Sequence, residues 1–289
     1  MLLDKPVGIT SFQVIRILKN FFPQKTKIGH CGTLDPFASG FLLIAIGKAT
    51  KLVEYAMDFE KSYSFTMRWG IETDTDDHTG KVINHSIIIP QEHQILSKKN
   101  EFIGNINQIP PTFSAVKING VRSYQYARKN IRVLLQSKKV TLKKISLISH
   151  HKDVSEFSII TSKGFYVRSF ARDLARSLNT FAHVIKLRRN VNGIFCKKHL
   201  IDCKKIKDFL HSNQTCDYIM DRLLPFDYTL TGIPTYEADL VNTETIKQKR
   251  YLKIKLQQKD CSKVLLKNNS KIVAVCLYNN GLLKVTKIL

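Results

Sequence analysis

Long apolar runs are absent from this chain of 289 residues, since no stretch approaches the ~20 consecutive apolar residues that a membrane-spanning helix requires. No basic amphipathic helix with a wide apolar face stands out either, so we expect no membrane contact. The opening residues, Met1–Pro6, read directly as structured sequence, which indicates neither an export signal nor a transit peptide. Together these observations predict a cytoplasmic protein.

The motifs that bind common cofactors are missing as well. The sequence has neither a glycine-rich phosphate loop nor a dinucleotide-binding loop. Its six cysteines form no C-x-x-C pair and, without an export signal, are expected to be reduced. A zinc site could be drawn from Cys196, His199, Cys203 and His211, but their spacing fits no standard zinc module. We therefore predict that the protein uses no cofactor and no metal.

Acidic residues are scarce, because 23 Asp and Glu stand against 46 Lys and Arg, which gives a formal net charge of +23. A field of this sign attracts polyanions, so a nucleic acid is the expected partner. The alternative is a lysine-rich solvated surface from a biased genome, which the many Asn, Ile and Lys residues support. The acidic stretch 72–80 is unusual in such a chain. It lacks the terminal glutamate of an EF-hand loop, and its simplest interpretation is a solvated loop.

Periodicity predicts a chain of mixed helices and strands. Apolar residues at helical spacing predict a helix over residues 11–22. Alternating apolar and polar residues predict a half-buried strand over 62–69, and Asn119-Gly120 is a strong hairpin signal. From about residue 231 onward, short strand patterns separated by turn signals predict a small β-barrel appended to the larger domain.

The segment 165–169 follows a Lys-Gly turn and alternates in character. This alternation predicts an extended segment with Tyr166 and Arg168 on one face. Apolar side chains then recur at four-residue spacing from Phe170, so a helix is expected only after the extended segment.

The stretch 29–40, GHCGTLDPFASG, holds a single carboxylate, Asp35. A proline disfavours the helical region for the residue before it, so Pro36 places Asp35 at a stiffened point of a tight loop. A buried strand is expected directly after the loop, over 41–46. A carboxylate on a rigid loop beside a core strand is a plausible reacting group, although Asp-Pro is also an ordinary turn dipeptide.

Seven short motifs follow one another along nearly the whole chain. They are LDKPVG at 3–8, GHCGTLDPFASG at 29–40, KSY at 61–63, TDTDD at 73–77, PPTFSAVK at 110–117, SKGFYVR at 162–168 and HVIKLRR at 183–189. In this order they resemble the motifs of the tRNA pseudouridine synthase B family, whose members isomerise the T-loop uridine at tRNA position 55.

The resemblance implies roles residue by residue. Asp35 aligns with the catalytic aspartate of the family, and Arg168 with the arginine that pairs with it. Tyr63 aligns with the tyrosine that stacks on the target base, which must flip out of its folded loop. Further positions align with Tyr166 and Leu187 as walls of the active site, His30 as a histidine that enters the T-loop, and Asp77 as a carboxylate near the flipped nucleotide.

The resemblance also implies the architecture and the partner. The fold class is α+β, with a mixed, mainly antiparallel central sheet flanked by helices and a small C-terminal β-barrel. Residues 1–230 align with the catalytic domain, in which 113–141 form a lobe that clamps RNA, and 231–289 align with a shortened PUA domain. The expected partner is the T-arm of tRNA, bound by a monomer without an obligatory protein partner. The glycines of the Asp35 loop are expected to let backbone approach an RNA loop.

The residue types suit this chemistry. Pseudouridine formation breaks the C1′–N1 bond and joins C1′ to C5 of the same base, so it needs no redox step. One anionic group near the sugar is required, and Asp35 could either attack C1′ or remove the C2′ proton. Glycosidases usually need two carboxylates, whereas here the uracil anion is a tolerable leaving group. Arg168 would hold Asp35 ionised and aimed by a bidentate pair.

Other interpretations compete with this one. Asp35 and Arg168 could form a purely structural salt bridge, and Tyr63 and Leu187 could be plain core residues. At the level of the whole protein, the rivals are a non-catalytic tRNA-binding protein, a synthase subunit that needs a guide RNA, and a glycoside hydrolase. Retention of Asp35, Tyr63 and Arg168 among matching motifs favours the enzyme.

Overall fold

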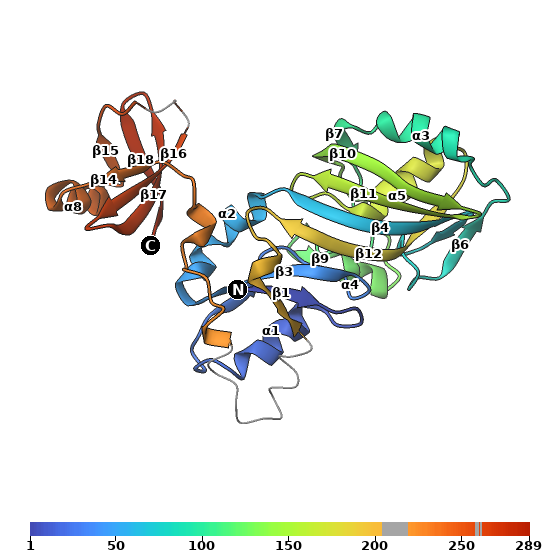
Figure 1. Cartoon of the computed structure of the whole chain (residues 1–289), viewed down its shortest axis with the longest axis horizontal. Coiled ribbons are helices and arrows are strands. Elements are labelled where there is room, and N and C mark those ends of the chain that lie inside the picture. The colour runs from blue at the N-terminus through green and yellow to red at the C-terminus, as the bar shows by residue number, and fades with distance from the viewer. Residues whose placement is uncertain (204–218, 258–259, 261) are drawn as a thin grey trace.

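Two β-sheets dominate the computed structural model of the chain (Figure 1), which describes residues 1–203, 219–257, 260 and 262–289. A large central sheet contains nine strands, and a smaller sheet near the C-terminus contains five. The smaller sheet lies at one end of the molecule, next to helix α2 (Val53–Asp58). None of the helices in the described part of the chain is both long and apolar enough to cross a membrane.

The central sheet is mixed and mainly antiparallel, as predicted. Only the β1–β13 and β3–β12 pairs run parallel among the pairings described. Its strands in spatial order are β13 (Leu200–Asp202), β1 (Leu2–Lys5), β3 (Ser39–Ile46), β12 (Ala182–Asn192), β4 (Lys61–Trp69), β11 (Val154–Thr161), β10 (Lys138–His151) and β7 (Gly104–Gln108), and β2 (Ile28–His30) pairs with β3.

Alternation in the sequence explains the strand at the middle of this sheet. In β4 the residues Tyr63, Phe65, Met67 and Trp69 are all buried, while the side chains between them are more exposed. Phe65 stacks on Phe157 of the neighbouring β11, with ring centroids 5.2 Å apart. Aromatic pairs of this kind add to the stabilisation that burial provides.

Helices cover the sheet and connect its strands. Helix α1 (Ser11–Lys19) begins at a capping box, in which Thr10 Oγ1 accepts from the amide of Gln13 and Gln13 Oε1 accepts from the amide of Thr10. It ends at Lys19, before the predicted limit. Further helices in the described part of residues 1–230 are the 3₁₀ helix η1 (Gly47–Leu52), then α2, α3 (Glu92–Asn100), α4 (Ser123–Arg128), α5 (Val167–Ser177) and the 3₁₀ helices η2 (Lys197–His199) and η3 (Tyr228–Leu230).

The predicted extended segment 165–169 is wrong, because α5 already begins at Val167 and Arg168 lies in its first turn. Extended backbone ends at Tyr166, whose amide donates to Gln108 Oε1 (2.7 Å) and whose carbonyl accepts from Gln108 Nε2 (3.0 Å). From Val167 onward the apolar side chains recur at helical spacing and are buried, including Phe170, which meets Phe65 edge-on at 6.0 Å.

The C-terminal sheet is curled, and α8 (Leu240–Lys249) connects two of its strands along the chain. Its ends do not join, since no pairing links β14 to β15 within the described ranges, and it forms a half-barrel in place of the expected barrel. It contacts the N-terminal part of the chain at α2, where Tyr55 Oη lies 3.3 Å from Thr286 Oγ1. Its strands are β14 (Thr235–Glu237), β16 (Ser262–Asn268), β17 (Lys271–Asn279), β18 (Leu282–Ile288) and β15 (Tyr251–Lys253), in the order 14-16-17-18-15.

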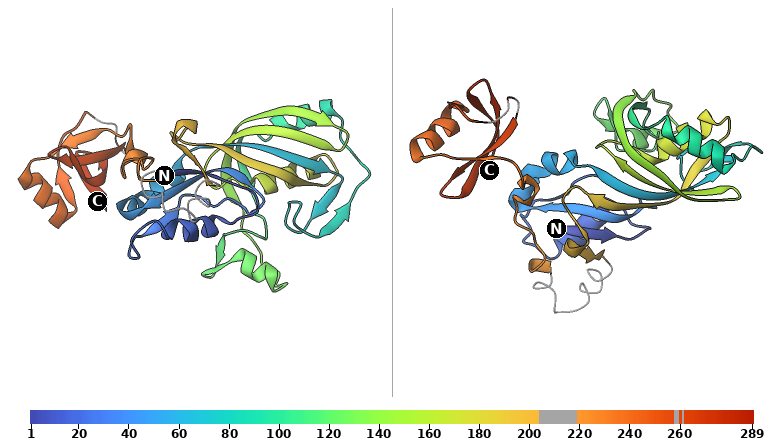
Figure 2. Two further views of the ribbon diagram at one scale, coloured as in Figure 1. Left: turned by 60° about the horizontal axis from the view of Figure 1, so that its bottom comes forward. Right: turned by 45° about the horizontal axis from the view of Figure 1, so that its top comes forward.

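Two short hairpins complete the described fold. The strands β5 (Ile71–Thr73) and β6 (Val82–His85) flank the acidic stretch. The strands β8 (Lys117–Ile118) and β9 (Val121–Arg122) meet at the predicted Asn119-Gly120 turn. Together with α4, this second hairpin projects from the body of the molecule (Figure 2, green).

Candidate active site

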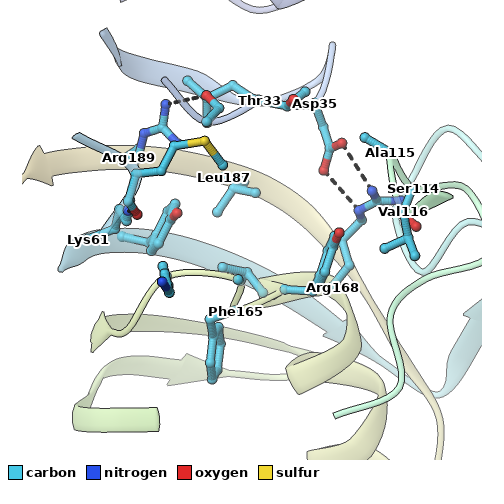
Figure 3. A pocket seen from close by; sticks show the side chains of 18 of the residues that line it. Thr33, Asp35, Lys61, Ser114, Ala115, Val116, Phe165, Arg168, Leu187 and Arg189 are labelled. Carbon is cyan, nitrogen blue, oxygen red and sulfur yellow. Dashed lines mark hydrogen bonds and ion pairs between the residues drawn. The ribbon is translucent and has the colours of Figure 1, made fainter. Parts of the chain in front are cut away.

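A cavity of about 480 Å³ opens where the Asp35 loop, β4, β12 and the start of α5 converge. Its two ends differ, because Asp35 and Arg168 face each other on one side while Lys61 and Arg189 lie on the other, with Leu187 between them (Figure 3). Of the residues expected in the active site, five line this cavity: Asp35, Tyr63, Tyr166, Arg168 and Leu187.

Two nitrogens of Arg168 bind the carboxylate of Asp35. Nη2 donates to Asp35 Oδ1 at 3.0 Å, and Nε lies 2.9 Å from Oδ2. The guanidinium itself is fixed, since its remaining donors reach the carbonyls of Thr75 (2.8 Å) and Phe113 (3.0 Å) and its side chain is only 4% exposed. The Asp35 side chain is 31% exposed, so the carboxylate is both aimed and reachable from the cavity.

Buried polar groups hold the loop that carries Asp35. Ser11 Oγ bonds both the amide and the carbonyl of Leu34. The ammonium of Lys5 donates to the carbonyls of Pro6 and Ile9 (both 2.8 Å) and points to that of Pro36 (3.4 Å). Burial lowers the pKa of Lys5 to about 8, although the Asp35 carboxylate opposes this effect. The loop is therefore anchored on both sides of the carboxylate.

Burial also acts on Asp35 and raises its pKa above the ordinary value. The Arg168 guanidinium opposes the rise, the Asp77 carboxylate adds to it, and Lys5 opposes it more weakly. Ionised Asp35 is thus a partly desolvated carboxylate that depends on Arg168 for its charge.

Tyr63 and Leu187 form the floor and wall of the cavity. Each is 8% exposed, so each packs in the core and presents only an edge to the cavity. The core interpretation is therefore confirmed, and a place in the cavity lining is compatible with it. Tyr166 also borders the cavity, and burial raises the pKa of its phenol, which keeps the hydroxyl protonated.

Lys61 and Arg189 also line the cavity, although sequence reasoning assigned them no role. Lys61 Nζ donates to the carbonyls of Met57 and Phe59, both at 2.5 Å, and burial lowers its pKa to about 8. Arg189 is 2% exposed, and its Nε donates to Phe41 O at 2.6 Å. Both residues stand inside the quoted motifs, but a motif does not tell which of its cations are buried.

Two expected site residues lie outside the cavity wall. Asp77 is 5% exposed and lies behind Arg168, with Oδ2 3.3 Å from Nη1. Its other oxygen accepts from the amide of Thr79 (3.0 Å) and the hydroxyl of Thr75 (2.9 Å). Asp77 therefore contacts the arginine and not the cavity. His30 lies on β2 with its Nδ1 buried and without a hydrogen-bond partner in the described part of the chain, and burial lowers its pKa.

The expectation that the loop glycines approach RNA is wrong for Gly40. Its φ is +103°, and a Cβ there would lie 2.2 Å from the carbonyl oxygen of Arg189. Gly40 is thus required where β3 runs against the backbone of β12. By contrast, nothing lies within 4 Å of a Cβ built on Gly29.

The structure offers no support for a metal site within residues 1–203, 219–257, 260 and 262–289, where no three His, Cys, Asp or Glu residues gather closely enough. Cys196 Sγ lies 3.6 Å from His199 Nδ1, and no third ligand joins them in those ranges. His211, the fourth member of the zinc hypothesis, lies outside the described residues.

Two family models match consecutive parts of the chain. The N-terminal domain of the TruB family pseudouridylate synthases matches residues 19–167. The C-terminal domain of tRNA pseudouridylate synthase B matches residues 168–231. The boundary between the two matches falls next to Arg168.

Curated relatives match over most of their length. The tRNA pseudouridine synthase B of Ehrlichia ruminantium is 38% identical over 292 residues, which covers 99% of this chain and 97% of the relative. That of Rhodospirillum rubrum is 42% identical over 233 residues, or 80% of this chain and 74% of the relative. A chain from the crystal structure of a Cbf5–Nop10–Gar1 complex shares the fold, with a TM-score of 0.71 at 22% identity over 99% of this chain and 83% of that one.

Proposed function

The chain belongs to the TruB family of pseudouridylate synthases, and on that premise we propose that it converts the T-loop uridine at position 55 of tRNA to pseudouridine. The observation that carries the proposal is the bidentate Asp35–Arg168 pair at the edge of a cavity beside Tyr63. A volume of about 480 Å³ falls within the roughly 300–1,000 Å³ of small-ligand sites and suits one flipped nucleotide.

Asp35 is the catalytic residue in this proposal. Its carboxylate faces the sugar, where it either attacks C1′ or removes the proton on C2′ as the C1′–N1 bond breaks. The base then turns and C5 bonds to C1′. In the first route this step breaks the bond between Asp35 and C1′, and in the second route Asp35 returns the proton to C2′. The hydrogen on C5 then leaves to solvent and N1 gains a proton. Arg168 keeps the carboxylate ionised before it reacts, because burial alone would favour the protonated acid.

The cavity walls retain and orient the base. Tyr63 offers a fixed ring on which the extruded uracil stacks. Leu187 excludes water, so that the detached base reacts with C1′ before it escapes. Tyr166 supplies a protonated hydroxyl at the rim. Asp77 contributes through Arg168, which it contacts at 3.3 Å.

The remaining surfaces bind the rest of the tRNA. Residues 1–230 act as the catalytic domain. The lobe 113–141, whose β8–β9 hairpin and helix α4 project from the body of the molecule (Figure 2), clamps the T-arm together with His30. Residues 231–289 act as a small PUA-like domain that extends the basic surface. The protein works in the cytoplasm as a monomer and needs no obligatory protein partner.

Release of tritium tests the reaction. The substrate is an unmodified tRNA transcript labelled with tritium at uridine C5, and isomerisation frees this label to water. The wild-type protein should release about one label per tRNA, and Asp35→Asn should release none while it still binds. Asp153→Asn is the matched control, because Asp153 also pairs with an arginine, Arg68 at 2.9 Å, but on the exposed surface.

A second transcript tests the position of the target. It carries cytidine in place of the T-loop uridine and keeps every other labelled uridine. The proposal expects no release from this transcript. Release from it would place the target elsewhere in the tRNA, and full activity of Asp35→Asn would remove Asp35 from the chemistry.

A further inference from the structure

Helix α5 carries a row of arginines at four-residue spacing, which places them on one face of the helix. This arginine row docks the acidic stretch that is unusual in so basic a chain. The ion pairs are Arg168 Nη1–Asp77 Oδ2 at 3.3 Å, Arg172 Nη1–Asp76 Oδ2 at 2.9 Å and Arg176 Nη2–Glu72 Oε1 at 2.5 Å.

Arg172, the middle arginine, is more buried than Arg176, the third, and it contacts an additional segment of the chain. The side chains of Arg172 and Asp76 are 12% and 9% exposed, whereas that of Arg176 is 56% exposed. Arg172 also extends Nη2 to the carbonyl of Ile109 at 2.9 Å, and this carbonyl accepts a second bond from Ser169 Oγ at 2.8 Å. Arg172 thus joins the acidic stretch to a third segment of the chain.

Ile109 lies where the chain enters the lobe 113–141. Two prolines follow it, and each fixes its own φ. The next bond to α5 comes at Phe113, whose carbonyl accepts from Arg168 Nη2 at 3.0 Å. The root of the lobe is therefore tied to α5 at Ile109 by Arg172 and at Phe113 by Arg168.

Both segments that Arg172 anchors also supply carbonyls to Arg168. One carbonyl is that of Thr75 at 2.8 Å, next to Asp76, and the other is that of Phe113. These carbonyls set the plane of the guanidinium that grips Asp35. A shift of either segment would turn that plane without any change in the groups that touch the substrate.

We propose that Arg172 is a positioning residue for the isomerisation: by holding Asp76 and the carbonyl of Ile109, it fixes the lobe root and the acidic stretch around Arg168 and so aims Asp35. The proposal rests on the proposed function, in which Asp35 is catalytic and the lobe clamps tRNA. It gives the 72–77 segment a task in the reaction beyond that of a solvated loop.

The test compares Arg172→Lys with Arg176→Lys. Lysine keeps the positive charge but has one donor head, which cannot span Asp76 and Ile109 together. The single-turnover rate at saturating enzyme should fall roughly tenfold in Arg172→Lys, in line with the loss of about one hydrogen bond. The Kd for tRNA should stay within about twofold, and Arg176→Lys should behave as wild type, since most of its side chain is solvated.

Two further readouts separate positioning from simple loss of folded protein. Asp35 is faced by Arg168, Asp77 and Lys5, so a turned Arg168 should move the acid limb of the rate profile to higher pH. A smaller folded fraction would lower the rate equally at every pH. An unchanged limb, with a rate loss that matches the loss of folded protein by circular dichroism, would overturn the proposal.

Hydrogen exchange tests the anchoring without reference to activity. Arg172→Lys should speed amide exchange over 73–77 and 112–114, and Arg176→Lys should not. If the wild-type protein proves inactive on tRNA while this contrast holds, the proposed function fails and the anchoring stands. Equal exchange in both variants would refute the anchoring, whatever the activity.

Discussion

Arg168 holds both carboxylate oxygens of Asp35, with Nη2 3.0 Å from Oδ1 and Nε 2.9 Å from Oδ2, although the two residues come from a loop and a helix far apart in the chain. A fork of this kind fixes direction as well as charge. The orientation of the carboxylate is thus set before any RNA arrives.

Arg168→Lys should therefore lower the single-turnover rate of tritium release by roughly 10–100-fold, which corresponds to one or two charge-assisted hydrogen bonds. The charge remains but the fork is lost, so the Kd for tRNA should change little. Arg68→Lys is the control, because that arginine pairs with Asp153 on the surface. Equal rates for the two variants would show that only the charge of Arg168 matters.

The rate of tritium release should fall in acid, and the midpoint of this fall should lie above pH 3.8, the ordinary pKa of an aspartic acid side chain. In the proposed function Asp35 acts as a carboxylate. Burial raises its pKa, so protonation should remove activity as the pH drops through that raised value. Arg168 lowers the pKa of Asp35, so Arg168→Gln should move the limb to still higher pH. If the acid limb of the pH–rate profile lies at the same pH in Arg168→Gln as in the wild type, the proposed electrostatic effect of Arg168 on Asp35 is contradicted. The measurement is single-turnover tritium release between pH 4 and pH 9.

The aromatic ring of Tyr63 should contribute more to activity than its hydroxyl group does. Tyr63→Phe keeps the face on which uracil stacks, and its kcat/KM should remain within a few-fold of wild type. Tyr63→Leu loses about 1–3 kcal/mol of stacking, so kcat/KM should fall by roughly 10–100-fold. Because Tyr63 is also a core residue, thermal unfolding of both variants must accompany the kinetics. Equal activity of the two variants would exclude stacking.

Gly40→Ala should destabilise the fold far more than Gly8→Ala. Both glycines have positive φ, at +103° and +92°, and an alanine there costs about 1–2 kcal/mol for the backbone alone. At Gly8 a new Cβ meets nothing within 4 Å, whereas at Gly40 it would strike Arg189 O at 2.2 Å. The β3–β12 pairing must then shift, which adds a cost of about 1–3 kcal/mol or more. Urea unfolding of both variants measures the difference.

Thiol labelling should single out Cys196 among the cysteines described. It is exposed, whereas Cys31 and Cys276 are buried. Burial raises the pKa of these two thiols to about 11 and about 12, so almost no thiolate forms at neutral pH. Peptide mass mapping after brief alkylation at pH 7.5 should find Cys196 modified and the buried Cys31, Cys203 and Cys276 intact. Rapid modification of Cys31 would show that the core beside the Asp35 loop opens readily.

The sequence was sufficient for individual strands, which depend on local patterns, and through its motifs for most of the cavity lining. Alternation identified β4 and with it Tyr63, and motifs identified Asp35, Arg168 and Leu187. The start of α5 was mispredicted because Tyr166 is held extended by Gln108, a residue of a distant strand. No local pattern contains such a partner.

Buried cations were beyond the reach of the sequence for a related reason. Lys, Arg and Glu are expected at the surface unless paired. Lys5, Lys61 and Arg189 are buried because backbone carbonyls accept hydrogen bonds from them. Those carbonyls become available only when the chain has folded around them. The spacing of the arginine row was visible in the sequence, whereas its acidic partners were not.

The order of the central sheet has a consequence for biosynthesis. Strands β3 and β4 do not pair with each other, since β12 lies between them and pairs with both. A growing chain on the ribosome therefore presents the Asp35 loop and Tyr63 long before the strand that joins them has been made. Such non-local pairing forms late. Chains truncated before Ala182 lack this joining strand, so an interrupted translation product should have no active site and leave tRNA unmodified.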